Sequence, residues 1–221
     1  MKEKLNGKDL INIGIFSAIY FVIVFITAML GMVPILYPML TVICPLVGGV
    51  VYMLFLTRVK KFGMIWIMSI LMGILMLISG MSWYALAIGV FSGLIADLIF
   101  KSGNYGSSVK GVLSHAVLSL WIFGNYLLFY LNHESYMKTR EEMVGKEYVD
   151  KLNSLLPMWS WVILLAATLF FGLIGGMVGR SMLKNHLSKA GIARWHNCYP
   201  LTSPTEVLCL IRGASLPLCF R

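Results

Sequence analysis

The sequence predicts an all-α fold, a polytopic membrane protein built as a bundle of about six transmembrane helices. The first observation is composition: the 221 residues are 59% hydrophobic and only 12% charged, whereas soluble domains hold roughly 25% charged residues. The second is a series of six apolar stretches near the ~20 residues that cross a bilayer. The third is that basic residues cluster between these stretches. Lipid must therefore cover part of the apolar surface.

The six predicted spans follow one another along the chain. They cover residues 10–30, 37–57, 62–79, 84–100, 112–131 and 158–183. Between the first two spans, Pro34 and Pro38 predict a broken or re-entrant stretch instead of continuous helix. The last two spans are joined by a long polar connection, residues 132–157.

That connection contains two acid–base pairs at helical spacing. Glu142 with Lys146, and Glu147 with Lys151, stand four residues apart, a spacing that stabilises helices. Part of the connection is therefore predicted to be helical. Two interpretations stay open, a cap over the outer mouth of the bundle and a solvated connector.

Lysines and arginines predict the orientation of the chain. If six spans alternate, four clusters of basic residues fall on the same side of the membrane. They lie before the first span, after the second, between the fourth and fifth, and at the end of the sixth: Lys2, Lys4, Lys8, Arg58, Lys60, Lys61, Lys101, Lys110, Arg180, Lys184 and Lys189. The positive-inside rule then puts both termini in the cytoplasm. This pattern accounts for the net charge of +9, so we expect no nucleic-acid partner.

The end of the chain differs from the rest. Residues 1–193 are predicted to form the membrane domain, and residues 194–221 a disordered C-terminal extension in which periodicity disappears. A readthrough or frameshift product, and so a non-native segment, is an alternative origin of this extension. It holds Cys198, Cys209 and Cys219. No cysteines are spaced as CxxC and Cys44 is interpreted as a small core residue, so we expect no metal site and no cofactor.

Polar and aromatic side chains collect toward the outer ends of the spans. The candidate substrate-binding residues are Tyr37, Trp83, Tyr84, Asn125, Tyr126, Tyr130 and His133. An aromatic belt at the membrane interface is the alternative, and we favour it for Trp159 and Trp161. Asn125 is different because a buried amide must find a partner. With Tyr126 and Trp83 it can line a pocket for a small ligand.

Two polar residues lie toward the other ends. Asp97 is the one acid inside a predicted span, which by default suggests a function. Pairing with Lys101, one turn further along, is a structural alternative that we favour. His115 has no second ligand nearby, so it is not predicted to bind metal. It is predicted to form a hydrogen bond between helices.

Small residues recur at four-residue spacing in two spans. Gly14 and Ala18 form such a pair in the first span; the sixth has the pairs Gly172 with Gly176 and Gly175 with Gly179. This spacing lets helices approach closely, within one chain or between chains. The chain has no G-x-x-x-x-G-K-[ST] phosphate loop and no H-E-x-x-H motif, so it is not expected to hydrolyse ATP by that route or to be a zinc protease.

Two motifs carry a resemblance to a known family. GLIADLI stands at residues 93–99, and GGMVG at 175–179 is followed by LKNHLSKAGI at 183–192. With six short spans and the Gly14–Ala18 pair, the chain resembles the S component of an energy-coupling factor (ECF) transporter, in the Trep_Strep or MptD-type group of integral membrane proteins. The resemblance covers about residues 4–193.

The resemblance implies a transport function in the plasma membrane of a bacterium. An S component captures a vitamin or similar micronutrient outside the cell and delivers it through a scaffold (T) subunit that is powered by two separate ATPase subunits. Gly14 and Ala18 would occupy the positions of the scaffold-docking motif, although the family usually has alanine at the place of Gly14. The resemblance implies no pocket residues, because the ligand of this group is unsettled.

Three other classes of function compete with this one, and the first is a pure assembly factor that binds no ligand. An autonomous small permease or channel would need an alternating-access repeat or a lined pore. An intramembrane protease is favoured less: Glu141 and Glu142 with Lys146 only partly match an EExxxR motif, and Ser82 has no histidine at matching depth to activate it. We therefore expect no enzyme activity.

Overall fold

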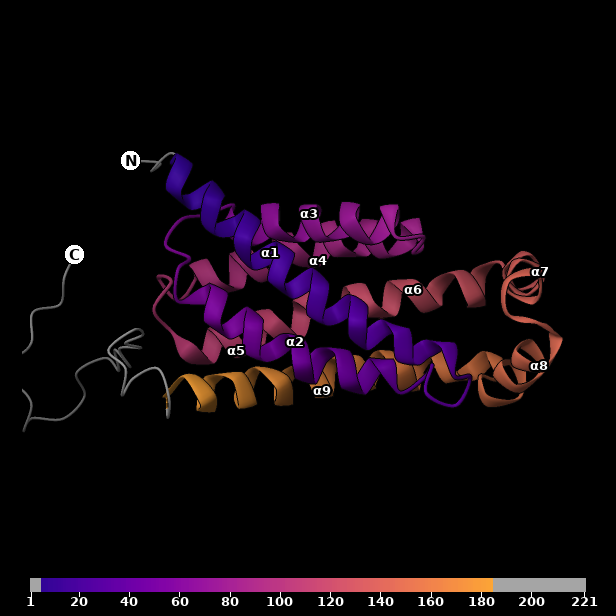
Figure 1. Ribbon diagram of the computed structural model, residues 1–221. Helices are drawn as coiled ribbons and strands as arrows, with labels where there is room; N and C mark the ends of the chain where they lie inside the picture. Colours follow the sequence, from indigo (N-terminus) through magenta and orange to yellow (C-terminus); the bar gives the residue numbers. More distant parts are fainter. Residues whose placement is uncertain (1–4, 185–221) are drawn as a thin grey trace, which may run out of the picture.

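The computed structural model describes residues 5–184, which form a bundle of helices (Figure 1). No strand occurs within these residues. The α-helices are α1 (Gly7–Ala28), α2 (Leu40–Leu56), α3 (Met64–Ile78), α4 (Trp83–Lys101), α5 (Ser108–Leu118), α6 (Leu120–Leu131), α7 (His133–Val144), α8 (Lys146–Leu155) and α9 (Trp161–Met182). Two short 3-10 turns are η1 (Met29–Met32) and η2 (Met158–Ser160). The predicted extension, residues 194–221, lies outside the described residues.

The predicted all-α membrane fold is confirmed, and each predicted span contains a helix. In the part of the chain that the structure describes, four stretches are long and apolar enough to cross a bilayer: Gly7–Met32, Trp83–Lys101, Ser108–Leu131 and Met158–Met182. α2 and α3 are equally apolar but have only 17 and 15 residues. At 1.5 Å per residue they are shorter than the ~30 Å hydrocarbon core. Length and composition therefore give four candidate spans within residues 5–184, and the predicted number of about six is not confirmed.

Two interruptions shape the long spans. The fifth predicted span is divided at Ser119, whose hydroxyl donates to the carbonyl of His115 at 2.8 Å; this local bond bends helices. After α1 the chain continues as η1 and a series of turns that contain Pro34 and Pro38. The predicted break between the first two spans is thus confirmed.

The bundle has two chemically different ends (Figure 1). At one end lie the start of α1, the end of α9 and the α2–α3 and α4–α5 connections. We call it the basic end, because it holds Arg58, Lys101 and Arg180. An ion pair of 3.0 Å between Lys61 and Asp9 joins the α2–α3 connection to α1 there. Helices α7 and α8 lie at the opposite end, which we call the capped end.

Helix α9 packs closely against α2 and α5. We call this contact the glycine seam; its glycines are Gly49, Gly172, Gly175, Gly176 and Gly179. A Cβ atom on Gly175 would lie 2.2 Å from the Pro45 carbonyl oxygen of α2, and one on Gly172 would lie 2.9 Å from the Ala116 Cα of α5. Both small-residue faces predicted on α9 therefore pack against helices of this same chain.

The polar connection folds into two helices that cover the end of the bundle. α7 and α8, residues 133–155, form a helical cap with a break at Gly145, whose φ is +89°. The Tyr136 hydroxyl donates to the Tyr37 hydroxyl at 3.0 Å, and the Tyr148 hydroxyl donates to the Gly31 carbonyl at 2.6 Å. Leu152 is completely buried. These contacts favour a cap over a solvated connector.

Of the two predicted ion pairs in this connection, one forms. Lys151 and Glu147 are 3.1 Å apart on the exposed surface of α8. Glu142 and Lys146 lie on either side of the break at Gly145, so they do not share a helix.

Candidate functional site

A cavity of about 430 Å³ lies beneath the helical cap, within the ~300–1,000 Å³ typical of small-molecule sites. Its walls come from the end of α1, η1, the start of α2, the end of α3, α6 and the cap. The lining residues are mostly apolar: Val24, Phe25, Ala28, Met29, Gly31, Met32, Tyr37, Leu40, Cys44, Met76, Ser79, Met81, Trp121, Ile122, Asn125, Tyr126, Arg140, Met143, Val144 and Tyr148. Segments distant in sequence thus share one site.

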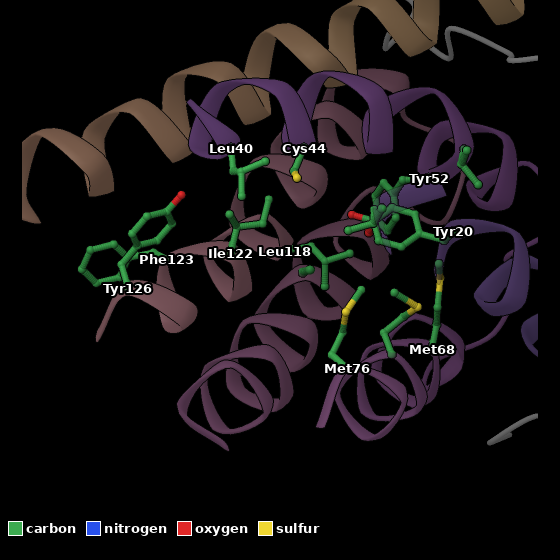
Figure 2. Packing of buried hydrophobic residues seen from close by; sticks show 14 of the residues in the cluster. Tyr20, Leu40, Cys44, Tyr52, Met68, Met76, Leu118, Ile122, Phe123 and Tyr126 are labelled. Carbon is green, nitrogen blue, oxygen red and sulfur yellow. The ribbon is translucent and has the colours of Figure 1, made fainter. Parts of the chain in front are cut away.

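Apolar side chains from α2, α3 and α6 form the deep part of the cavity. Figure 2 shows Leu40 and Cys44 of α2 pointing toward Ile122 of α6, with Met76 of α3 on a further side. Cys44 is 3% exposed, as predicted for a core residue. A ligand's apolar body would gain stability by leaving water here.

One charged side chain faces this apolar space. Among the described residues that line the cavity, Arg140 of α7 alone is charged. Its guanidinium carbon lies 5.3 Å from the centre of the Tyr136 ring and 5.9 Å from that of Tyr37, within the range of cation–π contacts. No carboxylate of residues 5–184 lies within 4.0 Å of it. Arg140 is therefore a cation without an acidic partner in the described chain.

A second polar group lacks a partner. The Asn125 side-chain oxygen is buried and accepts no hydrogen bond from the described residues. Its neighbour Tyr126 is 1% exposed, and its hydroxyl donates to the Tyr37 carbonyl at 2.5 Å. The two tyrosine rings are 4.9 Å apart. The tyrosines thus fix one wall, while the amide oxygen beside them is available to a donor from a ligand.

The structure divides the predicted substrate-binding residues into two groups. Tyr37, Asn125 and Tyr126 line the cavity together. Trp83, Tyr84, Tyr130 and His133 are not among its lining residues.

Each residue of the second group has another environment. Trp83 is 58% exposed and stacks on Tyr84 with ring centres 4.1 Å apart, as in an aromatic belt. The Tyr130 hydroxyl shares a hydrogen bond of 2.6 Å with Ser160. His133 packs edge-on against Phe129 at 4.8 Å.

Most lining residues were not predicted, among them Trp121, Arg140 and Tyr148, which carry polar groups. For Trp121 and Arg140, the spacing to other residues in the sequence indicated a position at the cavity. Trp121 precedes Asn125 by four residues, and Arg140 follows Tyr136 by four. Residues four apart lie on the same face of a helix, so Trp121 shares a face with Asn125 and Arg140 shares one with Tyr136. Nothing in the sequence indicated where Tyr148 lies, because this depends on how the cap folds back.

Asp97 holds the start of α3. One of its carboxylate oxygens accepts hydrogen bonds from the backbone N–H of Gly63 at 2.7 Å and of Trp66 at 3.4 Å. A carboxylate at a helix N-terminus stabilises the unpaired N–H groups and the helix dipole. The structural interpretation is supported, but no direct ion pair with Lys101 forms: the Lys101 ammonium lies 4.7 Å from the Phe62 ring centre, and no described base lies within 4.0 Å of Asp97. Lys101 therefore acts on Asp97 only by attraction over a longer distance.

His115 joins two helices, as predicted. Its Nδ1 N–H donates to the Gly172 carbonyl of α9 at 2.8 Å, and its ring lies 5.2 Å from that of Tyr52. Within residues 5–184, no group of three His, Cys, Asp or Glu residues could hold a metal ion.

The remaining candidate residues do not line the cavity. Gly14 and Ala18 are exposed on α1, and a Cβ atom on Gly14 would meet nothing within 4 Å. Ser82 caps α4, accepting a hydrogen bond from the Tyr84 backbone N–H at 3.3 Å. Glu141 and Glu142 are exposed on α7. None of these lines the cavity.

Comparison with known proteins adds a family. No curated protein and no solved structure matches the chain. The model of the family described as "hypothetical bacterial integral membrane protein (Trep_Strep)" matches residues 7–189. This match covers both the bundle and its cap. The chain belongs to the Trep_Strep family of bacterial integral membrane proteins.

Proposed function

We propose that this chain is the substrate-binding membrane subunit of an ECF-type ABC importer. It captures a vitamin or similar micronutrient outside the cell, with both termini in the cytoplasm. It delivers this cargo through a scaffold subunit and two separate ATPase subunits. The chain itself catalyses no reaction in this proposal.

The observation that carries the proposal is the capped cavity. A space of about 430 Å³ with apolar walls and few polar groups suits a small molecule. It lies at the end opposite the clustered basic residues, and such residues favour the cytoplasmic side. The cavity would then face outward, where a cargo is captured.

The exposed face of α1 supports a partner. Gly14 and Ala18 are both exposed on α1. At Gly14, no other helix of the described chain comes within 4 Å of where a Cβ atom would lie. The small residues of α9, in contrast, are used inside the bundle. A scaffold helix can approach α1 closely at this place. Because the sequence has no phosphate loop, energy would come from separate ATPases.

A co-purification experiment tests this proposal. The chain is purified from mildly solubilised membranes of its host, alongside the double variant Gly14→Leu, Ala18→Leu. The matched control is Ala166→Leu, a small-to-large change at another exposed helix position, on α9. We expect a scaffold and two ATPases with the wild type and the control, and their loss with the double variant. A chain that comes down alone in every case contradicts the proposal.

Reconstitution separates this function from that of an autonomous permease. Vesicles that contain only this chain should bind a ligand without accumulating it. Accumulation that needs no ATPase subunits would favour the permease instead.

A further inference from the structure

We infer that the capped cavity binds an amphipathic organic anion, with Arg140 at its anionic group and Asn125 at a hydrogen-bond donor on its apolar body. The anionic group is a carboxylate or a phosphate. This inference names the ligand class for the cavity, and its place in uptake rests on the function proposed above.

Arg140 provides the first step. Its side chain is partly buried at the cavity, yet no carboxylate of the described residues pairs with it. The neighbouring acids Glu141 and Glu142 are exposed. A cation at an apolar surface requires compensation, and the two tyrosine ring faces supply only part of it. The planar N–H donors of guanidinium match a carboxylate or a phosphate.

The tyrosines around Arg140 do not neutralise it. Burial raises the pKa of the Tyr148 phenol, so this group is uncharged at physiological pH. Burial acts to lower the pKa of Arg140, but the oxygens of Tyr136, Tyr37 and Tyr148 raise it, and the net shift is upward. A fixed positive charge therefore faces the cavity across the physiological pH range.

Asn125 provides the second step. Its buried oxygen has no donor in the described chain, and an unpaired buried acceptor is unfavourable. Trp121 precedes it by one helical turn and also lines the cavity, with Phe25 and Met76 as further apolar walls. A flat or branched apolar body that carries one N–H or O–H group would pack against the apolar walls and donate a hydrogen bond to the Asn125 oxygen.

Other ligand classes fit these walls less well. A cationic ligand would meet Arg140 with no acidic side chain among the described lining residues, which is electrostatically unfavourable. A purely hydrocarbon ligand would leave both Arg140 and Asn125 unpaired. The anionic group can belong to a soluble molecule or to a lipid headgroup, and the experiment must distinguish the two.

The test measures the charge preference of the cavity directly. Cys44, Cys198, Cys209 and Cys219 are replaced by serine, and Met32→Cys is introduced. Met32 lies in η1, lines the cavity and is 62% exposed, so reagents reach it from a wall other than α7. A methanethiosulfonate carrying either a sulfonate or a trimethylammonium group labels this thiol in nanodiscs of zwitterionic phosphatidylcholine; the thiolate forms a disulfide and releases methanesulfinate.

Arg140→Gln should lower the ratio of anionic to cationic labelling rates by about tenfold. The matched control Lys138→Gln changes an exposed charge on the same helix and should have a several-fold smaller effect. Arg140→Lys, which retains the charge, should keep most of the ratio. An unchanged ratio in Arg140→Gln, with Met32→Cys still labelled, overturns the inference.

Competition then tests binding and its source. Indole-3-propionate should slow labelling more than its primary amide does, and Arg140→Gln should abolish this difference. Equal or absent protection by the two compounds counts against the inference. Adding phosphatidylglycerol to the nanodiscs identifies the source: protection that depends on Arg140 assigns the anion to a lipid headgroup, and its absence assigns it to a soluble molecule.

These results do not depend on partner subunits. If the charge preference holds but no scaffold co-purifies, the ligand class stands and the importer proposal fails. If the scaffold co-purifies but the preference is absent, only the ligand class fails.

Discussion

The glycine seam and the capped cavity involve some of the same helices but are built by opposite means. In the seam, the absence of side chains lets backbones touch: a Cβ atom on Gly49 would lie 2.3 Å from the Gly175 carbonyl oxygen. At the cavity, large side chains such as Trp121 and Tyr126 keep α6 and its neighbours apart around an open space. Helix α2 takes part in both, with its start at the cavity and its middle in the seam.

The two regions differ in whether their unpaired polar groups adjoin the cavity: the buried His115 Nε2, beside the seam, has no partner in the described chain but does not line the cavity. Beside the seam, the Ser114 hydroxyl donates to the Ala96 carbonyl at 2.8 Å and contacts the Tyr52 hydroxyl at 2.7 Å. At the cavity, the Asn125 oxygen lacks a donor and Arg140 lacks an acid within the described chain. Close packing gives a rigid unit, whereas unpaired groups around a space indicate a site awaiting a ligand. Mutations should therefore affect stability at the seam and binding at the cavity.

The largest expected effect on stability is that of Gly175→Leu. A Cβ atom there already overlaps the Pro45 carbonyl oxygen at 2.2 Å, and backbone cannot move aside as a flexible side chain can. Overpacking typically costs 1–3 kcal/mol, and we expect about 3 kcal/mol or more here. The measurement is the free energy of unfolding in mixed micelles.

The control for this change is Gly14→Leu, the same substitution on the exposed face of α1, where a Cβ atom meets nothing within 4 Å. It should change the unfolding free energy by less than about 0.5 kcal/mol. Similar losses at both positions would show that glycine itself, and not the seam, determines the result.

Asp97→Ala should have the next largest effect. It leaves the backbone N–H groups of Gly63 and Trp66 without their carboxylate acceptor, and an unsatisfied buried donor costs about 1–3 kcal/mol. Amide hydrogen exchange should accelerate at the start of α3 and remain unchanged in α9. Asp97→Asn retains one acceptor oxygen and should lose less; an equal loss would indicate that negative charge at the helix terminus is the main contribution.

A smaller effect is expected at the cap. Tyr148→Phe removes the hydrogen bond from the hydroxyl to the Gly31 carbonyl, 2.6 Å long, and should cost about 1 kcal/mol. Because this bond joins α8 to η1, hydrogen exchange should accelerate in α8 before the bundle opens. Thr139→Val, on the exposed side of α7, serves as the control. Exchange that accelerates throughout the bundle would mean that the cap is not a separate unit.

Sequence patterns predicted the helices better than their arrangement. Hydropathy located a helix in every predicted span, and Pro34 and Pro38 located the break after α1. The bend at Ser119 was not predicted, because it depends on the hydrogen bond that the serine hydroxyl donates to the carbonyl one turn earlier. The four-residue spacing of glycines predicted close packing, but it does not encode which helix is the partner.

The candidate site was predicted only in part, for a physical reason. Depth and polarity correctly brought Tyr37, Asn125 and Tyr126 to one end of the bundle. The same criteria also selected Trp83, whose exposed side chain faces away, because hydropathy does not record which way a helix is rotated. Arg140 was missed since it belongs to a polar connection, and the fold of that connection brings it over the cavity.

The smallest expected effect on stability, and a sharp one on binding, is that of Asn125→Leu. Its oxygen has no partner in the described chain, so the unfolding free energy should change by less than about 0.5 kcal/mol, or even rise. Indole-3-propionate, whose ring N–H can donate to that oxygen, should bind about tenfold more weakly, measured by protection of Met32→Cys. The 1-methyl derivative lacks this donor, so the substitution should not alter its affinity. Asn153→Leu, an exposed change on α8, should leave both affinities unchanged. A large loss of stability in Asn125→Leu would instead mean that the amide supports the fold, and the contrast between a close-packed seam and a cavity with an unpaired oxygen for a ligand would no longer hold.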